Sequence, residues 1–147
     1  MKNAFFAIAA AFLLTPQTVA GGETPANPDA EVYVIDLADG QTVSSPVVVK
    51  FGLRGMGVAP AGTEKEMTGH HHVFVNRPPL GEGEDGADEF SNGIPSDENH
   101  VHFGGGQTET ELDLPPGRHT LQLVLGDAGH VPHDPPVVSE VITIIVE

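Results

Sequence analysis

The chain is divided into short β-branched and apolar runs by frequent turn residues, and this pattern limits its fold more than any other feature. It contains 18 glycines and 13 prolines among 147 residues, and no segment keeps a helical period over three turns. The strand-like runs are residues 31–37, 46–53, 69–76, 107–114, 118–125 and 137–146. Together they predict an all-β protein, an immunoglobulin-like or fibronectin-like sandwich of about seven strands.

The first twenty residues have the composition of a secretory signal peptide. Lys2 supplies a positive start, residues 4–14 are an unbroken apolar run, and small residues precede a predicted cleavage after Ala20. The apolar run is shorter than a comfortable membrane span. We therefore expect a periplasmic or secreted protein with no stable membrane span after the signal is cleaved.

The remaining chain is predicted to form a short leader and one domain. Residues 21–30 contain two prolines and no hydrophobic period, which indicates a flexible leader. Residues 31–147 form the predicted β-sandwich domain, interrupted by a long acidic, glycine-rich loop at 77–99. That loop lacks the spaced Asp ladder and closing Glu of a calcium loop, so we expect a solvated, mobile insertion.

Charge and cysteine content exclude several functions. Lys and Arg total 6 against 21 Asp and Glu, a formal net charge of -15. Nucleic acids and anionic membranes need a basic surface, so neither is an expected partner. The absence of cysteine excludes disulfides, thiolate zinc sites, iron–sulfur clusters and cysteine nucleophiles.

Eight histidines stand out against this composition, and seven of them form three groups. The groups are His70, His71 and His72; His100 and His102; and His130 and His133. Residues i and i+2 of a strand point to the same face, so two His-x-His pairs on neighbouring strands could converge on one ion.

The favoured hypothesis is a metal-binding protein that holds or delivers its ion. The predicted ligands are His70, His72, His100 and His102, with His71, His130 and His133 in reserve. Without thiolates the site suits Cu(II), Zn(II) or Ni(II), and the affinity order places copper before zinc. The alternative for His71 and His119 is a structural role, since both share a strand face with core residues.

Two other classes of function remain open. A non-catalytic interaction module would bind a glycan or another periplasmic protein through the loops at 58–68 and 77–99. A metalloenzyme is less favoured, because His70-x-His72 is not followed by the glutamate of a cupin-like site. A histidine brace would need an N-terminal histidine, where cleavage would leave Gly21. Histidine clusters at opposite ends of the sandwich would favour the interaction module.

Longer motifs add a family resemblance. They include Gly69–His72, the run from Asp97 to Glu109, the run from Leu114 to Leu123, and the run from His130 to Pro136. From Val32 to the C-terminus the chain resembles the bacterial secreted domain-of-unknown-function family 4399. The resemblance implies a single exported β domain whose motif includes the grouped histidines, and it implies no established reaction.

Overall fold

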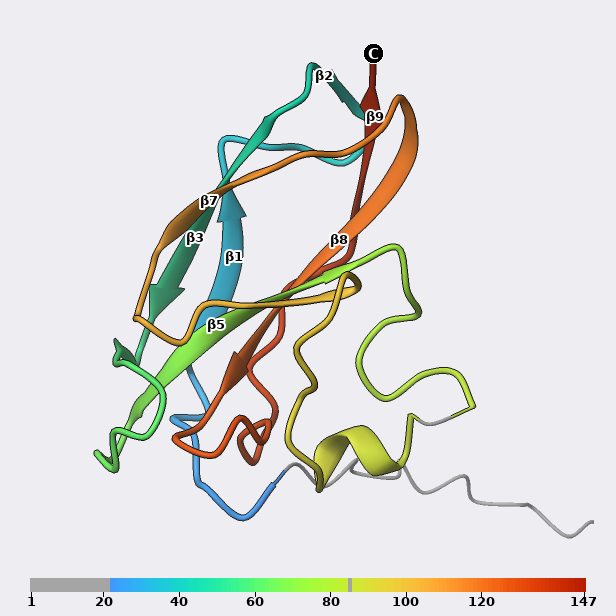
Figure 1. The fold of residues 1–147 in the computed structure, drawn as a ribbon. Helices are drawn as coiled ribbons and strands as arrows, with labels where there is room; N and C mark the ends of the chain where they lie inside the picture. Colours follow the sequence, from blue (N-terminus) through green and yellow to red (C-terminus); the bar gives the residue numbers. More distant parts are fainter. Residues whose placement is uncertain (1–21, 85) are drawn as a thin grey trace, which may run out of the picture.

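The computed structural model describes residues 22–84 and 86–147, which form two packed β-sheets (Figure 1). The predicted all-β sandwich is confirmed, with nine strands in the described part of the chain instead of about seven. The strands are β1 (Glu31–Ile35), β2 (Gln41–Val43), β3 (Val47–Arg54), β4 (Gly57–Val58), β5 (Thr68–Val75), β6 (His100–His102), β7 (Glu109–Leu112), β8 (Gly117–Gly126) and β9 (Ile142–Val146). The predicted signal peptide lies outside the described residues.

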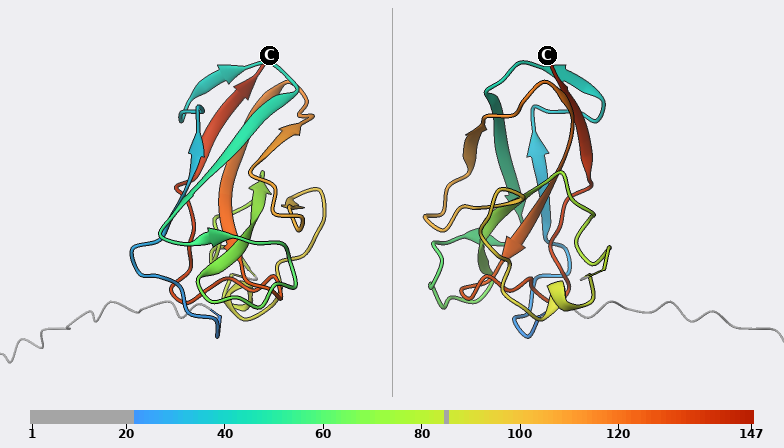
Figure 2. Two further views of the ribbon diagram at one scale, coloured as in Figure 1. Left: turned by 90° about the vertical axis from the view of Figure 1, so that its left-hand side faces the viewer. Right: turned by 45° about the vertical axis from the view of Figure 1, so that its right-hand side comes forward.

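The two sheets differ in size. The smaller sheet has the order β1-β3-β7, and the larger one runs β2-β9-β8-β5-β4 with β6 also paired to β5. The views in Figure 2 show the two layers from the side. Because β4 and β6 pair with different parts of β5, the loops that carry them lie along that one strand.

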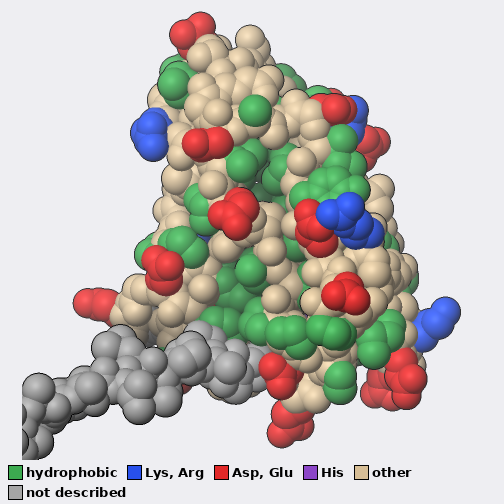
Figure 3. Space-filling view, turned by 180° about the vertical axis from the view of Figure 1, so that it is seen from behind, with side chains coloured by type: hydrophobic (Ala, Val, Ile, Leu, Met, Phe, Trp, Pro, Cys, Tyr) green, Lys and Arg blue, Asp and Glu red, His purple; other side chains and the backbone are tan. Residues whose placement is uncertain are grey.

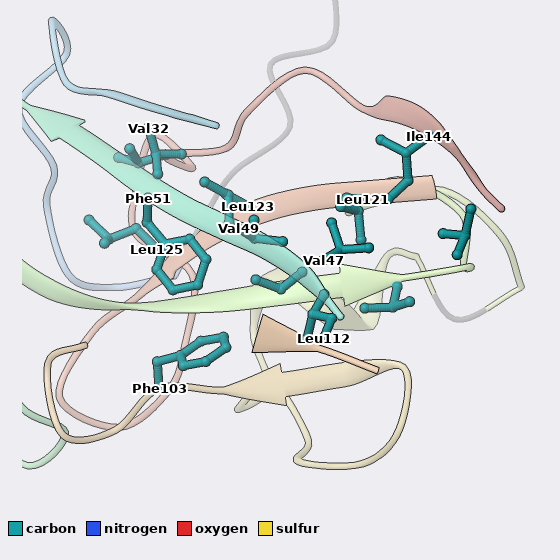
Figure 4. Close-up of a cluster of buried hydrophobic side chains, with 14 of the residues drawn as sticks. Val32, Val47, Val49, Phe51, Phe103, Leu112, Leu121, Leu123, Leu125 and Ile144 are labelled. Carbon is teal, nitrogen blue, oxygen red and sulfur yellow. The ribbon is translucent and has the colours of Figure 1, made fainter. Parts of the chain in front are cut away.

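The main core fills the space between the sheets. Alternate side chains of β3, from Val47 to Phe51, meet alternate side chains of β8, from Leu121 to Leu125 (Figure 4). This is the period of two expected for strands with one face inward. Burial of these apolar side chains is the principal source of stability in a chain without disulfides.

Strand β5 is buried on both faces, and this position defines the rest of the molecule. His71, Val73 and Val75 point toward the main core, whereas the alternating residues point to the opposite face of the larger sheet. On that outer face Phe74 packs with Val124 and Ile94 in a second, smaller cluster. The outer face around β5 is therefore covered by loops, and polar side chains there are shielded from water.

The N-terminal segment, predicted as a flexible leader, pairs with the loop before β9. The backbone nitrogen of Ala26 donates to the Asp134 carbonyl at 2.8 Å, and Asp134 donates back to Thr24 at 2.9 Å. Ala26 is buried. Residues 22–30 are thus fastened to the loop before β9 by backbone hydrogen bonds, a pairing that hydrophobic periodicity could not indicate.

The loop at 77–99, predicted as a solvated insertion, has some buried residues. It contains a short 3-10 helix, η1 (Asp88–Phe90), and contributes the buried Ile94 to the smaller cluster. Arg77 and Glu89 form a largely buried ion pair within it. Its two ends are therefore packed against the sheet, although its middle is rich in glycine and acidic residues.

Acidic side chains are spread over the exterior, as Figure 3 shows for one face. Red carboxylates outnumber blue Lys and Arg side chains there, in agreement with the net charge of -15. Among the described residues no helix is long and apolar enough to span a membrane.

Candidate metal centre

Four imidazoles meet on the outer face of the larger sheet. They are His70 and His72 from β5, His102 from β6, and His130 from the loop after β8. One nitrogen from each ring lies within 4.8 Å of the others. The group is near the end of the sandwich where β5 begins and β8 ends, at the lower part of Figure 1.

Strand register explains why three of these rings are neighbours. His70 and His72 share the outer face of β5, two residues apart. His72 is directly opposite His102 in the antiparallel pairing of β5 and β6, where cross-strand Cβ atoms lie about 5 Å apart. The ring centroids of His72 and His102 are accordingly separated by 5.0 Å.

Two of the nitrogen–nitrogen distances match the spacing of adjacent ligands on one metal ion. His72 Nε2 is 3.0 Å from His70 Nε2, which is 3.1 Å from His130 Nδ1. Metal–nitrogen bonds of about 2.0–2.1 Å place two tetrahedral ligands roughly 3.3 Å apart and two adjacent square-planar ligands roughly 2.9 Å apart. The observed separations lie between these two values.

Hydrogen bonding alone cannot satisfy these nitrogens. Each nitrogen of a neutral imidazole either donates or accepts, so His70 Nε2 cannot bond both neighbours at once. In the described part of the chain, His102 Nε2 is buried without any partner. The outer nitrogens, His70 Nδ1 and His72 Nδ1, also lack partners among the described residues. If His70 and His72 carry their protons on Nδ1, the Nε2 lone pairs of both rings are directed at the centre of the histidine cluster.

Two glycines let the backbone approach the rings. A Cβ on Gly104 would lie 2.4 Å from His102 Cε1 and 2.7 Å from its Nε2. A Cβ on Gly126, opposite His70 in the sheet, would lie 2.9 Å from His72 Nε2. All three distances are shorter than van der Waals contact, so a side chain at either position would displace a ring from the cluster.

The fourth ring is held by the loop after β8. His130 has a φ of 69°, a left-handed conformation uncommon for residues other than glycine. Asp127 supports this turn: its Oδ1 accepts the backbone N–H of Gly129 at 2.8 Å and of Val131 at 2.9 Å. Its Oδ2 accepts the Thr24 hydroxyl at 2.6 Å. The N-terminal segment therefore helps to position His130.

Burial keeps the inner rings neutral. Burial first, and then the neighbouring imidazoles, lower the pKa of His70 to about 4 and that of His72 to about 2. The pKa of His102 is also lowered, by burial and then by His130. Neutral imidazole is the form that binds a metal ion. At neutral pH these three rings therefore need no deprotonation before they bind one.

The sequence of the domain matches a family model over residues 49–147, described as Domain of unknown function (DUF4399). The chain belongs to this family. The resemblance inferred from the motifs is confirmed, and all four clustered histidines lie within the matched residues. Comparisons with curated proteins and with solved structures found no match.

The DUF4399 domain places the remaining predicted ligands elsewhere. His100 is opposite Phe74, two pairs from the His72–His102 pair, and its Nδ1 lies 2.8 Å from Asp97 Oδ1. His71 points into the main core, 5.1 Å from the Phe51 ring centroid. His133 lies within 3.4 Å of the Leu125 carbonyl and 3.2 Å of the Thr68 carbonyl. His130, placed in reserve, takes the position predicted for His100.

The lone His119 has the structural role considered as its alternative. Its Nε2 donates to the Pro115 carbonyl at 2.8 Å, and its Nδ1 is 2.9 Å from the Asn76 amide nitrogen. Reasoning from the sequence missed Asp127 and Gly126 as supports of the cluster. The spacing Gly126-Asp127-x-x-His130 offered a local signal, because aspartate and glycine often build tight turns.

Proposed function

We propose that this protein binds a late divalent transition metal ion through His70, His72, His102 and His130, copper before zinc. The observation that carries the proposal is the convergence of four imidazole nitrogens that hydrogen bonds cannot satisfy. A single cation would accept all four lone pairs at once. An all-nitrogen set of imidazoles suits copper and zinc, and the affinity order favours Cu(II).

The burial of the centre supports a role in holding or delivering the ion. His70 and His72 are fully buried, whereas His102 and His130 are partly exposed. An ion would therefore exchange through the side formed by His102 and His130. The loop at 58–68 lies across this region, since Ala61 donates to the Gly104 carbonyl and Gly62 donates to that of Ala128, each at 2.9 Å.

The gathering of the histidines favours this hypothesis over an interaction module. Histidine clusters at opposite ends of the sandwich would have supported binding through loops alone. Instead, residues from β5, β6 and the loop after β8 meet at one place. Two of them, His70 and His130, are 60 residues apart in the sequence. Loops often carry function in such folds, but here the loop histidine joins a group formed by strands.

Metal titration of the untagged protein tests the proposal. After treatment with a chelator, calorimetry should show one Cu(II) or Zn(II) per chain, and Cu(II) should displace Zn(II). Replacing His130 with alanine should weaken binding by more than the roughly 10–100-fold typical of losing an outer partner. The matched variant His100→Ala should change affinity by less than about threefold, a shift of under roughly 0.7 kcal/mol.

Three outcomes would contradict the proposal. Binding no tighter than that of a protein with surface histidines alone would remove its basis. Equal losses in His130→Ala and His100→Ala would show that the four-imidazole cluster is not the site. Preference for zinc in direct competition would overturn the order of metals while leaving the site intact.

We also propose that the ion is bound in the periplasm or outside the cell, where the protein could pass it to another protein. This rests on the signal-like composition of residues 1–20. Mass spectrometry of protein from fractionated cells should find a chain beginning at Gly21 outside the cytoplasm. An uncleaved chain confined to the cytoplasm would contradict this location.

A further inference from the structure

A second hollow lies beside the metal centre and shares none of its four histidines. It has a volume of about 240 Å³ and lies between the larger sheet and the loop at 77–99. Its apolar wall is formed by Phe74, Ile94 and Pro95. A dry cavity of about 150 Å³ is known to accommodate a benzene ring, so this hollow has room for one ring with a polar substituent.

The charged groups in the wall largely neutralise one another. Arg77 and Glu89 form an ion pair, and the guanidinium carbon of Arg77 lies 4.7 Å from the centroid of the Phe74 ring. The other oxygen of Glu89 accepts the backbone N–H of Gly81 at 2.7 Å. With the cation paired and the exposed Asp88 also lining the hollow, an anionic ligand would meet no unpaired positive charge.

His100 also lines this hollow. Its ring stands edge-on to Phe74, with centroids 4.9 Å apart. Its Nδ1 lies 2.8 Å from Asp97 Oδ1, and the hydrogen bond to His100 lowers the pKa of Asp97, so the carboxylate is ionised and accepts. In neutral imidazole Nε2 is then the acceptor, and no described residue bonds it.

From this geometry we infer that the hollow binds a small uncharged ring compound that carries one hydrogen-bond donor, such as a phenolic hydroxyl. The ring would pack against Phe74 and Ile94, and the hydroxyl would donate to His100 Nε2. Polar groups placed precisely in a mainly apolar pocket are typical of small-molecule sites. His100 is thus a binding residue here, separate from the metal ligands.

Three probes distinguish the features of this site: phenol, toluene and benzoate. Amide chemical shifts of the chelator-treated native protein should change around residues 74, 94 and 100, with a Kd for phenol below about 1 mM. Toluene should bind roughly three- to tenfold more weakly, because it cannot make the hydrogen bond. Benzoate should bind more weakly still. No shifts at these residues with phenol would overturn the inference, as would benzoate binding as tightly as phenol.

Two variants test the acceptor itself. His100→Leu should bind phenol and toluene equally, whereas His100→Gln, which retains an acceptor, should keep part of the preference for phenol. Persistence of the full preference in His100→Leu would overturn the role of His100. Unchanged Zn(II) affinity in both variants is the control for folding, and it separates this test from that of the metal centre. Because the shift mapping uses the native chain, the inference stays testable if a variant fails to fold.

Discussion

Replacing His71 with leucine should make the stability of the protein less sensitive to acid. The His71 ring is fully buried among core residues and lies against Phe51. Burial lowers its pKa to about 4, a change opposed only by the backbone of Gln107. In the unfolded chain its pKa is 6.5. Below pH 6.5 the unfolded chain therefore binds a proton that the folded protein excludes, so the native state loses stability as the pH falls toward 4.

The magnitude follows from these two pKa values. At about pH 8 both states carry a neutral His71, and the contribution is close to zero. At about pH 5, protonation of His71 stabilises the unfolded chain by about 2 kcal/mol more than it stabilises the folded protein. Leucine carries no proton in either state. The stability of His71→Leu relative to the native protein should therefore rise by about 2 kcal/mol between pH 8 and pH 5.

Urea unfolding with a chelator present provides the measurement. The chain contains no tryptophan, so circular dichroism is the suitable signal. Comparison of the two proteins at each pH removes the shared contributions of His70 and His72. A control on the same face, Val73→Ala, should lower stability by the same amount at both pH values. A constant difference between His71→Leu and the native protein would refute the reasoning, because it would show that folding does not change the pKa of His71.

Three further changes test how the metal centre is supported, each by Zn(II) calorimetry. Asp127→Ala removes the acceptor of three hydrogen bonds in and beside the His130 loop. It should weaken Zn(II) binding roughly 10–100-fold. An unchanged affinity would show that the loop needs no such support. Gly104→Ala should weaken Zn(II) binding because its Cβ would overlap His102. The control Gly57→Ala meets only ordinary contacts at 3.4 Å and should leave Zn(II) binding unchanged. Equal Zn(II) affinities of the two variants would contradict the packing argument. A chain that begins at Asn27 lacks Thr24 and Ala26 and should lose affinity and melt at a lower temperature; full retention of both would show that this segment does not position the site.

Much of the strand pattern could be predicted because it depends on local chemistry. The alternation in β3 and β8 and the prolines and glycines between strands are visible in the sequence. The shortest strands, β2 and β4, were not predicted, and β6 was expected only from the spacing of His100 and His102. A strand of two or three residues has too few side chains to show a period, and its formation depends on a longer partner such as β9 or β5.

The candidate site was only partly predictable, for a related reason. His70 and His72 were expected to act together, and the structure places them together. His100 and His102 do share a face, but adjacent positions on that face are about 7 Å apart along the strand. Register places His102 opposite His72 and His100 opposite Phe74, so only one of the pair reaches the cluster.

The sequence by itself determined the strand period, and with it the opposite orientations of His71 and of its two neighbours. It also determined that no metal ligand is a thiolate, since the chain has no cysteine. Only the tertiary structure decided that His130 and His102 complete the cluster. His102 and His130 lie at least 30 and 58 positions along the chain from their partners His70 and His72 in β5. Strand register, the Asp127 turn and the approach of Gly104 and Gly126 bring them together, and no local pattern in the sequence specifies such distant contacts.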